Sequence, residues 1–338
     1  MTPHRPETML VMGAEAFAAQ FGPAEHDRLR TLASLGDPVH TEELTSPAAR
    51  RRLAEVEVLI TSWGAPPLDA EVLRAAPGLR AVLHAAGSVR GHVGDEVFDR
   101  DILVTTAAAA NAEPVAQFTL ASVLWAFKKV PFLAADARVH RADWSYRDGR
   151  GPLSGRDRTV VVLGYSRVGR RVVDLLVSLA VARVLVVDPV VDPAVITAAG
   201  AEPVSLAEAL PQADVLSLHA PSLPETRHLI GAAELAALPP GSVLINTARG
   251  ALVDTAALTS ACQRDGLHAI LDVTEPEPLP ADSPLYDLPN VVITPHIAGS
   301  LDSETRRLTA AALTELERLG AGLPALDEVT RETRAAQA

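Results

Sequence analysis

Three polar residues in the C-terminal half of the chain could together perform acid–base chemistry on an anionic substrate. Arg249, Glu277 and His296 each follow an apolar, strand-like run, in the strings INTARG, DVTEPEP and ITPHIAG. An imidazole can donate and accept a proton near neutral pH, and a carboxylate partner orients the ring and stabilises its protonated form. The planar arginine fork can bind a carboxylate at two points. These residue types predict a site that holds a small anion and transfers one proton.

An upstream segment has the pattern of a dinucleotide-binding βαβ unit. The apolar run at 159–163 is followed by GYSRVG at 164–169, a helical pattern to Leu179, and a second apolar run that ends in Asp188. Gly164 permits a tight turn, and Gly169 lets the helix lie close to the sheet, with its amino-terminal N–H groups facing a pyrophosphate. Asp188 is expected to accept hydrogen bonds from the adenosine ribose, which favours NAD over NADP.

Ser166 departs from this motif, because a glycine usually occupies the middle position. A Cβ there is expected to crowd the phosphates, although the hydroxyl could donate to one of them. The turn alone is equally compatible with an ordinary tight connection between a strand and a helix. The acidic residue about 20 positions further on favours the cofactor interpretation.

Size and composition limit the classes of function. A chain of 338 residues with 48% hydrophobic residues predicts two domains with separate cores. The net charge of -12 disfavours nucleic-acid and anionic membrane partners, and the run Arg50–Arg52 is expected to be a solvated helix face. Cys262, the single cysteine, is expected to fill a helix face rather than act as a nucleophile.

Several features that the sequence lacks predict a cytoplasmic protein without a metal site. The amino terminus has no secretory leader pattern, and no apolar run reaches the roughly 18 residues of a membrane span. With one cysteine an intramolecular disulfide is impossible. We find no His, Cys, Asp or Glu spacing typical of a metal site and expect none.

Apolar runs predict the order of the elements. In the first hundred residues we expect strands at 9–12, 56–60, 79–84 and 102–105. A long helix should begin at Asn111 or its neighbour, with Pro114 in its first turn, and end near Lys129. An irregular arm is expected from Arg138 to Gly155, with Trp144 and Tyr146. Beyond Asp188 we expect strands at 215–218, 243–246, 269–272 and 291–294, and a helix at 304–319.

In these motifs the chain resembles the D-isomer-specific 2-hydroxyacid dehydrogenases. The resemblance rests on AGSV at 86–89 and on the strings LHAPSLPETRHLI, LINTARGALVD, LDVTEPEPLP and ITPHIAG. It implies an α/β fold with two Rossmann-like parallel-sheet domains. A nucleotide-binding domain, residues 109–299, would be inserted into a smaller, flavodoxin-like substrate domain formed by residues 1–108 and 300–338.

The resemblance also implies a role for each motif. Arg249 would bind the substrate carboxylate and carbonyl, His296 would donate and accept the proton, and Glu277 would be its partner. Backbone N–H groups of the loop Gly87-Ser88-Val89, which reads GSV where many members read GVG, would hold the substrate carboxylate. Asp272 would face the nicotinamide amide or support the site. The full set of expected cofactor contacts is Gly164, Ser166, Arg167, Val168, Gly169, Asp188, His219, Ala220, Pro221, Thr247, Ala248, Asp272, His296 and Gly299.

The function expected from the resemblance is hydride transfer between NADH and a small 2-keto acid, in a homodimer formed through the long helix and the arm. Two alternatives stay open: an NAD-binding corepressor-like regulatory protein, and a phosphite or formate dehydrogenase of the same superfamily. Formate dehydrogenases carry glutamine in place of Glu277, which disfavours that activity. The substrate side chain is not specified by the sequence, and His84, Arg90 or Trp63 could contact it.

Overall fold

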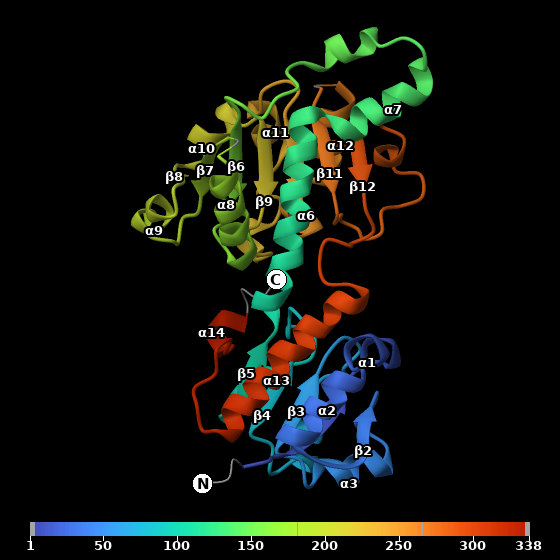
Figure 1. Ribbon diagram of the computed structural model, residues 1–338, viewed down its shortest axis with the longest axis vertical. Helices are drawn as coiled ribbons and strands as arrows, with labels where there is room; N and C mark the ends of the chain where they lie inside the picture. Colours follow the sequence, from blue (N-terminus) through green and yellow to red (C-terminus); the bar gives the residue numbers. More distant parts are fainter. Residues whose placement is uncertain (1–3, 181, 265, 335–338) are drawn as a thin grey trace. The chain divides into compact units, whose positions relative to one another are not determined.

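The chain folds into two compact α/β units, each built on a parallel sheet (Figure 1). The computed structural model describes residues 4–180, 182–264 and 266–334. Within these residues, one unit comprises the chain up to Asn111 and from Ser300 onward, and the other runs from Ala112 to Gly299. The predicted fold class, two parallel-sheet α/β domains, is confirmed.

The sheet of the first unit has the strand order β2-β1-β3-β4-β5, with every neighbouring pair parallel. This is the order of flavodoxin-like doubly wound sheets. Its strands are β1 (Glu7–Val11), β2 (Ser34–Thr41), β3 (Val58–Thr61), β4 (Ala81–His84) and β5 (Leu103–Thr106). Of these, only β2 was not predicted; its sequence, SLGDPVHT, carries a glycine and a proline that are tolerated because β2 is an edge strand.

Helices cover both faces of this sheet. Successive strand residues point to opposite faces, so Val11 enters one core and its neighbours Leu10 and Met12 enter the other. The helices are α1 (Ala14–Gln20), α2 (Pro23–Leu32), α3 (Pro47–Leu53), α4 (Ala70–Ala75), α5 (Asp95–Phe98), α13 (Arg306–Gly320) and α14 (Arg331–Arg334).

The prediction that Arg50–Arg52 is a solvated face was wrong for Arg52. This side chain is buried, pairs with Glu7 at 2.8 Å and donates to the carbonyl of Thr8. A guanidinium can be buried when carboxylate and carbonyl acceptors meet it, and the helical spacing of α3 turns this one arginine toward the sheet.

The sheet of the second unit has the order β12-β11-β10-β9-β6-β7-β8, again with all neighbours parallel. When β6 is counted as the first strand, this is the strand order of dinucleotide-binding sheets with one further strand, β12, added at the end. The strands are β6 (Thr159–Leu163), β7 (Arg183–Val187), β8 (Glu202–Pro203), β9 (Val215–Leu218), β10 (Val243–Asn246), β11 (His268–Leu271) and β12 (Val291–Ile293).

Two helices at the start of this unit differ from the prediction. The long helix α6 (Ala108–Lys128) begins three residues before Asn111, so Pro114 lies inside it and Asn111 is not its cap. Asn111 instead accepts a hydrogen bond from the N–H of Ser300 through its side chain. Residues 130–140 form a second helix, α7 (Val130–His140), which was not predicted; the irregular arm was expected to begin at Arg138, within its last turn.

The remaining helices of the second unit are α8 (Arg167–Leu179), α9 (Pro193–Ala198), α10 (Leu206–Ala209), α11 (Ala232–Ala237) and α12 (Thr255–Arg264). Short 3₁₀ helices include η1 (Ser145–Arg150) and η4 (Gly250–Leu252). No single helix in the described ranges is long and apolar enough to cross a membrane; α6 and α7 reach that length and composition only as a pair bent by 51°.

Candidate functional site

His296 and Glu277 are in direct contact in the second unit. Nδ1 of His296 lies 2.6 Å from Oε1 of Glu277. Because the carboxylate occupies Nδ1, Nε2 is the ring nitrogen left to exchange a proton with a bound molecule. The two side chains are 50% and 41% exposed, so this pair is accessible to a ligand rather than sealed in a core. The structure thus brings together two residues that lie 19 positions apart.

Asp272 fixes the loop that carries His296. Its buried carboxylate accepts hydrogen bonds from the Thr294 hydroxyl at 2.6 Å and from the N–H groups of Ile297 and Ala298 at 2.9 Å. The N–H of His296, which has a φ of 54°, donates to the Asp272 carbonyl. Of the two roles expected for Asp272, these contacts account for the supporting one.

Arg249 lies on a tight turn after β10. Asn246 supports this turn on both sides, since its amide donates to the Arg249 carbonyl at 2.9 Å and accepts from the N–H of Ala248 at 3.1 Å. A Cβ on Gly250 would come within 2.0 Å of the carbonyl carbon of Thr274. Only glycine therefore fits where the Arg249 turn meets the segment that leads to Glu277.

The three predicted residues follow three strands that are neighbours in one sheet. Arg249 comes after β10, Glu277 after β11 and His296 after β12. Carboxyl ends of parallel strands meet at one edge of a sheet, which is where ligands bind in open α/β sheets. At this edge a hydroxyl pair, Thr247 and Thr119 at 2.9 Å, also joins the Arg249 segment to α6.

The glycine turn after β6 has the close approaches that a dinucleotide site requires. A Cβ on Gly164, whose φ is +99°, would lie 2.5 Å from the N of Ala220, and one on Gly169 would lie 2.0 Å from the Gly164 carbonyl oxygen. The amino terminus of α8 follows directly, with Arg167 and Val168 in its first turn. This cradle fits a pyrophosphate.

Ser166 is the N-cap of α8. Its backbone is extended, with φ -71° and ψ -174°, a conformation that any residue adopts, and its hydroxyl accepts from the N–H of Gly169 at 3.3 Å. Serine is among the preferred residues at this position. The departure from glycine therefore introduces no backbone strain and gives the helix a cap.

Asp188 is held beside the same turn. Oδ2 accepts from the N–H of Tyr165 at 2.7 Å, and Oδ1 accepts from the N–H groups of Val190 and Val191 at 2.9 and 3.0 Å. Oδ2, which accepts one of these bonds, has capacity for a further donor. The acid is thus fixed at the end of β7, next to the turn after β6.

His219 is buried at the end of β9. Its Nε2 lies 2.8 Å from the Ser217 hydroxyl, and burial lowers the pKa of the ring to about 3. The ring is therefore neutral at physiological pH and is not a second acid. Ala220, the next residue, packs against Gly164, and Pro221 follows it.

The expected substrate loop belongs to the first unit. Gly87, Ser88 and Val89 follow β4; the Val89 side chain is fully buried, and its carbonyl accepts from the N–H groups of His92 and Val93. His84 was expected as a possible substrate contact, but its side chain is buried. Trp63, by contrast, is 44% exposed.

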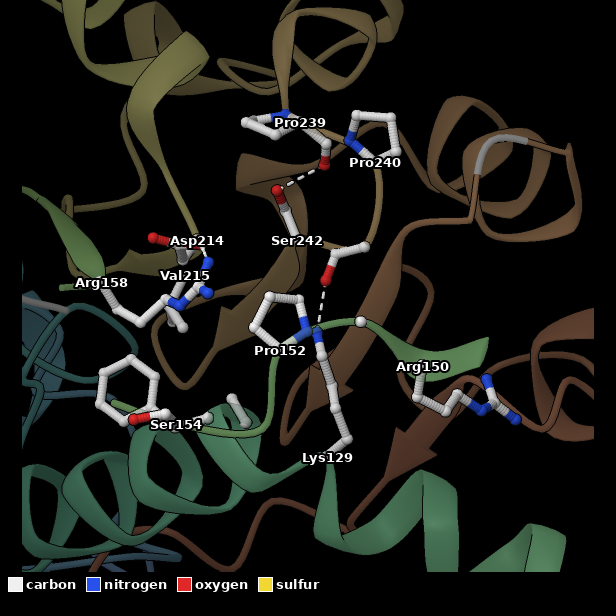
Figure 2. A pocket seen from close by; sticks show the side chains of 14 residues that line it. Lys129, Arg150, Pro152, Ser154, Arg158, Asp214, Val215, Pro239, Pro240 and Ser242 are labelled. Carbon is white, nitrogen blue, oxygen red and sulfur yellow. Dashed lines mark hydrogen bonds and ion pairs between the residues drawn. The ribbon is translucent and has the colours of Figure 1, made fainter. Parts of the chain in front are cut away.

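A hollow that the sequence did not predict lies at the amino ends of strands in the second sheet (Figure 2). Its lining includes Lys129, Arg158 and Asp214. Arg158 pairs with Asp214 at 2.7 Å, and the buried Lys129 donates to the Gly241 carbonyl. Burial lowers the pKa of Lys129 to about 8. These contacts tie the α6–α7 junction to the amino ends of the strands.

Residues 120–298 match the family model for the NAD-binding domain of D-isomer specific 2-hydroxyacid dehydrogenases. The chain belongs to this family. The matched segment lies in the second unit, so the glycine turn, α8 and Asp188 are parts of an NAD-binding domain, and NAD is its cofactor.

Similar proteins agree with this family. D-3-phosphoglycerate dehydrogenase of Mycobacterium tuberculosis is 38% identical over 277 residues, 80% of this chain and 51% of the relative. Glyoxylate reductase of Aeropyrum pernix is 34% identical over 278 residues, 78% of this chain and 80% of the relative. The chain thus spans about half the length of the phosphoglycerate dehydrogenases that it matches.

Solved structures with this fold include a phosphoglycerate oxidoreductase from Rhizobium etli, with a TM-score of 0.80, 25% identity, and coverage of 97% of this chain and 100% of that chain. D-lactate dehydrogenase of Aquifex aeolicus, complexed with NAD and lactic acid, has a TM-score of 0.70 and 27% identity, with coverage of 93% and 96%.

Proposed function

We propose that this protein transfers a hydride between NADH and a small 2-keto acid, forming a D-2-hydroxy acid, and catalyses the reverse reaction. The observation that carries the proposal is the 2.6 Å contact between His296 and Glu277. This acid–base pair lies in the same unit as the NAD-binding cradle, and its two residues follow β11 and β12, the next two strands beside β10, which precedes Arg249.

Bound NADH supplies the hydride in this proposal, and the residues of the chain bind and protonate the substrate. Negative charge develops on the carbonyl oxygen during reduction, so an acid is needed beside that oxygen. Nε2 of His296 gives it the proton. Glu277 orients the ring and stabilises its protonated form, and Asp272 holds the loop on which the ring sits.

Substrate orientation is assigned to Arg249 and to the loop in the first unit. The guanidinium can bind a carboxylate at two points, which fixes the face of the keto carbon that receives the hydride. The N–H groups of Ser88 and Val89 bind the substrate carboxylate in the same proposal.

A turnover assay tests this function. We expect NADH oxidation with at least one member of a panel of glyoxylate, hydroxypyruvate, pyruvate, phosphohydroxypyruvate and bulkier 2-keto acids. His296→Ala should lower the rate about 10²-fold or more while NADH still binds. NADH binding without turnover of any panel member would contradict the proposal and favour the NAD-binding regulatory class instead.

A further inference from the structure

A buried pair of hydroxyls joins α6 to the end of β10. Oγ1 of Thr119 lies 2.9 Å from Oγ1 of Thr247, the first residue after β10. The exposed fractions of Thr119 and Thr247 are 0% and 8%. Both residues belong to the second unit, which also contains the NAD-binding cradle. The contact therefore fixes a side chain at the sheet edge where ligands bind in open α/β sheets.

The burial of Thr119 determines the direction of this hydrogen bond. A hydroxyl inside a helix can donate to the carbonyl four residues earlier, as Ser122 does to Phe118 at 2.9 Å. In the described part of the chain Thr119 makes no such bond, and its hydroxyl contacts only that of Thr247. Solvent cannot accept the proton of a fully buried side chain. Thr119 is therefore the donor and Thr247 the acceptor.

The hydroxyl proton of Thr247 is then left for another acceptor. A hydroxyl has one proton and two lone pairs, so accepting from Thr119 does not use the proton. Across the described residues, the hydroxyl of Thr247 has no second partner. Because Thr247 is also partly accessible, a ligand at this edge can accept a hydrogen bond from it.

The backbone around Thr247 is held independently of Thr119. The side chain of Asn246 accepts from the N–H of Ala248 and donates to the carbonyl of Arg249. Loss of the Thr119 hydroxyl should therefore free the Thr247 side chain to rotate while the turn keeps its place.

The strand order indicates which part of NAD would lie near Thr247. The strands β7, β6, β9 and β10 are consecutive in the sheet, so their carboxyl ends follow one another along its edge. Asp188 lies after β7, and the glycine turn follows β6. With the adenosine at Asp188 and the pyrophosphate at the turn, the other half of NAD would extend past β9 to β10.

We propose that Thr119 is a positioning residue, which directs the hydroxyl proton of Thr247 toward the nicotinamide riboside of bound NAD. The ribose hydroxyls and the carboxamide oxygen of this half are hydrogen-bond acceptors. Thr247 touches the cofactor, whereas Thr119 acts on it only through Thr247. The inference concerns cofactor binding and goes beyond the proposed reaction.

The test compares the Kd of NADH with that of ADP, which lacks the nicotinamide riboside. Thr247→Val keeps the shape of the side chain without its hydroxyl and should raise the Kd of NADH about fivefold. Thr119→Val should raise it about threefold, because the Thr247 hydroxyl is then no longer oriented. Both variants should bind ADP as the parent does. Thr119→Ser, which keeps the donor, should restore the Kd of NADH.

Ser122→Ala is the matched control. Ser122 is a buried hydroxyl on the same helix, but it donates within that helix. This variant should leave the Kd of NADH and of ADP unchanged. The double variant of Thr119→Val and Thr247→Val should raise the Kd of NADH no more than Thr247→Val alone, because Thr119 acts through Thr247.

An unchanged Kd of NADH in Thr247→Val would overturn the inference. Equal losses of affinity for NADH and ADP would also overturn it, because they would report damage to the whole cradle. Parent affinity for NADH in Thr119→Val, or additive effects in the double variant, would overturn the positioning role of Thr119. These measurements contain no keto acid, so their result does not depend on the proposed reaction.

Discussion

The proposed proton-transfer pair depends on one contact, between Nδ1 of His296 and Oε1 of Glu277. Glu277→Gln keeps the shape of the side chain but removes the charge that favours the protonated imidazole. Keto-acid reduction needs the protonated ring, so its rate should decline at lower pH than in the parent. Oxidation needs the neutral ring, so its onset should move to lower pH as well. Rate profiles from pH 5 to 10 measure both shifts.

A nearby carboxylate serves as the control for this experiment. Glu275 lies two residues from Glu277 but pairs with Arg227 at 2.8 Å rather than with the ring of His296. Glu275→Gln should leave both pH profiles in place. If Glu277→Gln also leaves them unshifted, Glu277 is not the working partner of His296.

Asp188 should determine the choice between the two nicotinamide cofactors. Its carboxylate is held by three backbone N–H groups beside the glycine turn. We propose that it accepts from the adenosine ribose, so it would repel the 2′-phosphate of NADPH. We expect the parent to prefer NADH, and Asp188→Asn to lower the ratio of kcat/KM for NADH to that for NADPH about tenfold or more.

Asp192→Asn is the matched control for cofactor choice, because Asp192 caps α9 with the same chemistry four positions away. It should leave the NADH preference unchanged. Equal efficiency of the parent with both cofactors would contradict the role of Asp188.

Sequence patterns located helices and strands most closely where burial requires a run of apolar residues. Strands such as β6, β9 and β10 are buried on both faces, and their apolar runs located them closely. The edge strand β2 lacks such a run and was missed. Helix α7 was missed as well, although its sequence begins with the apolar run VPFLAA. Pro114 was expected in a first turn, where its missing N–H costs nothing, but α6 begins three residues before Asn111.

In the candidate site, too, some residues have a local sequence signal and others depend on distant parts of the fold. Arg249, Glu277 and His296 could be named as candidates because their motifs follow strands in order. The burial of His84 could not be read from the sequence, because it depends on Thr61 and His92, which reach it from other parts of the fold. Lys129 marked the predicted end of a helix and gave no signal of the hollow that it lines.

Lys129 links the α6–α7 junction to the sheet, and burying its charged amine lowers the free energy of unfolding. Its folded pKa of about 8 is below the value of 10.5 for an unperturbed lysine, so between these values the unfolded chain binds more protons than the folded one. The free energy of unfolding should therefore rise with pH over this window, by an amount on the order of 2 kcal/mol. Lys129→Met should remove this rise, as measured by urea unfolding from pH 7 to 10.5.

Lys128→Met is a close control, because Lys128 precedes Lys129 but is exposed. It should keep the pH dependence of the parent. A slope in Lys129→Met equal to that of the parent would show that this lysine is not desolvated in the folded protein.

For the whole molecule we predict a homodimer formed through α6, α7 and the segment that follows them. Trp125, Val139 and Trp144 are 55%, 77% and 71% exposed in the single chain, and large apolar side chains of this kind are typical of interfaces. Light scattering at micromolar concentration should give twice the monomer mass. Replacing Trp125 and Val139 together by serine should shift the mass toward the monomer.

Leu323→Ser is the control for assembly, since Leu323 is 53% exposed but belongs to the first unit. It should leave the mass unchanged. A monomeric parent under these conditions would contradict the predicted dimer.

The hydrogen bonds of Asp272 have a consequence for the slow motions of the protein. The N–H groups of Ile297 and Ala298 lie outside any strand, yet both donate to a carboxylate that is 2% exposed. Their exchange with deuterated water should be as slow as that of amides in β11, because opening this loop requires a buried charge to lose its partners. The loop that carries His296 would then open only together with the sheet beneath it, so the proton donor would keep its position between turnovers.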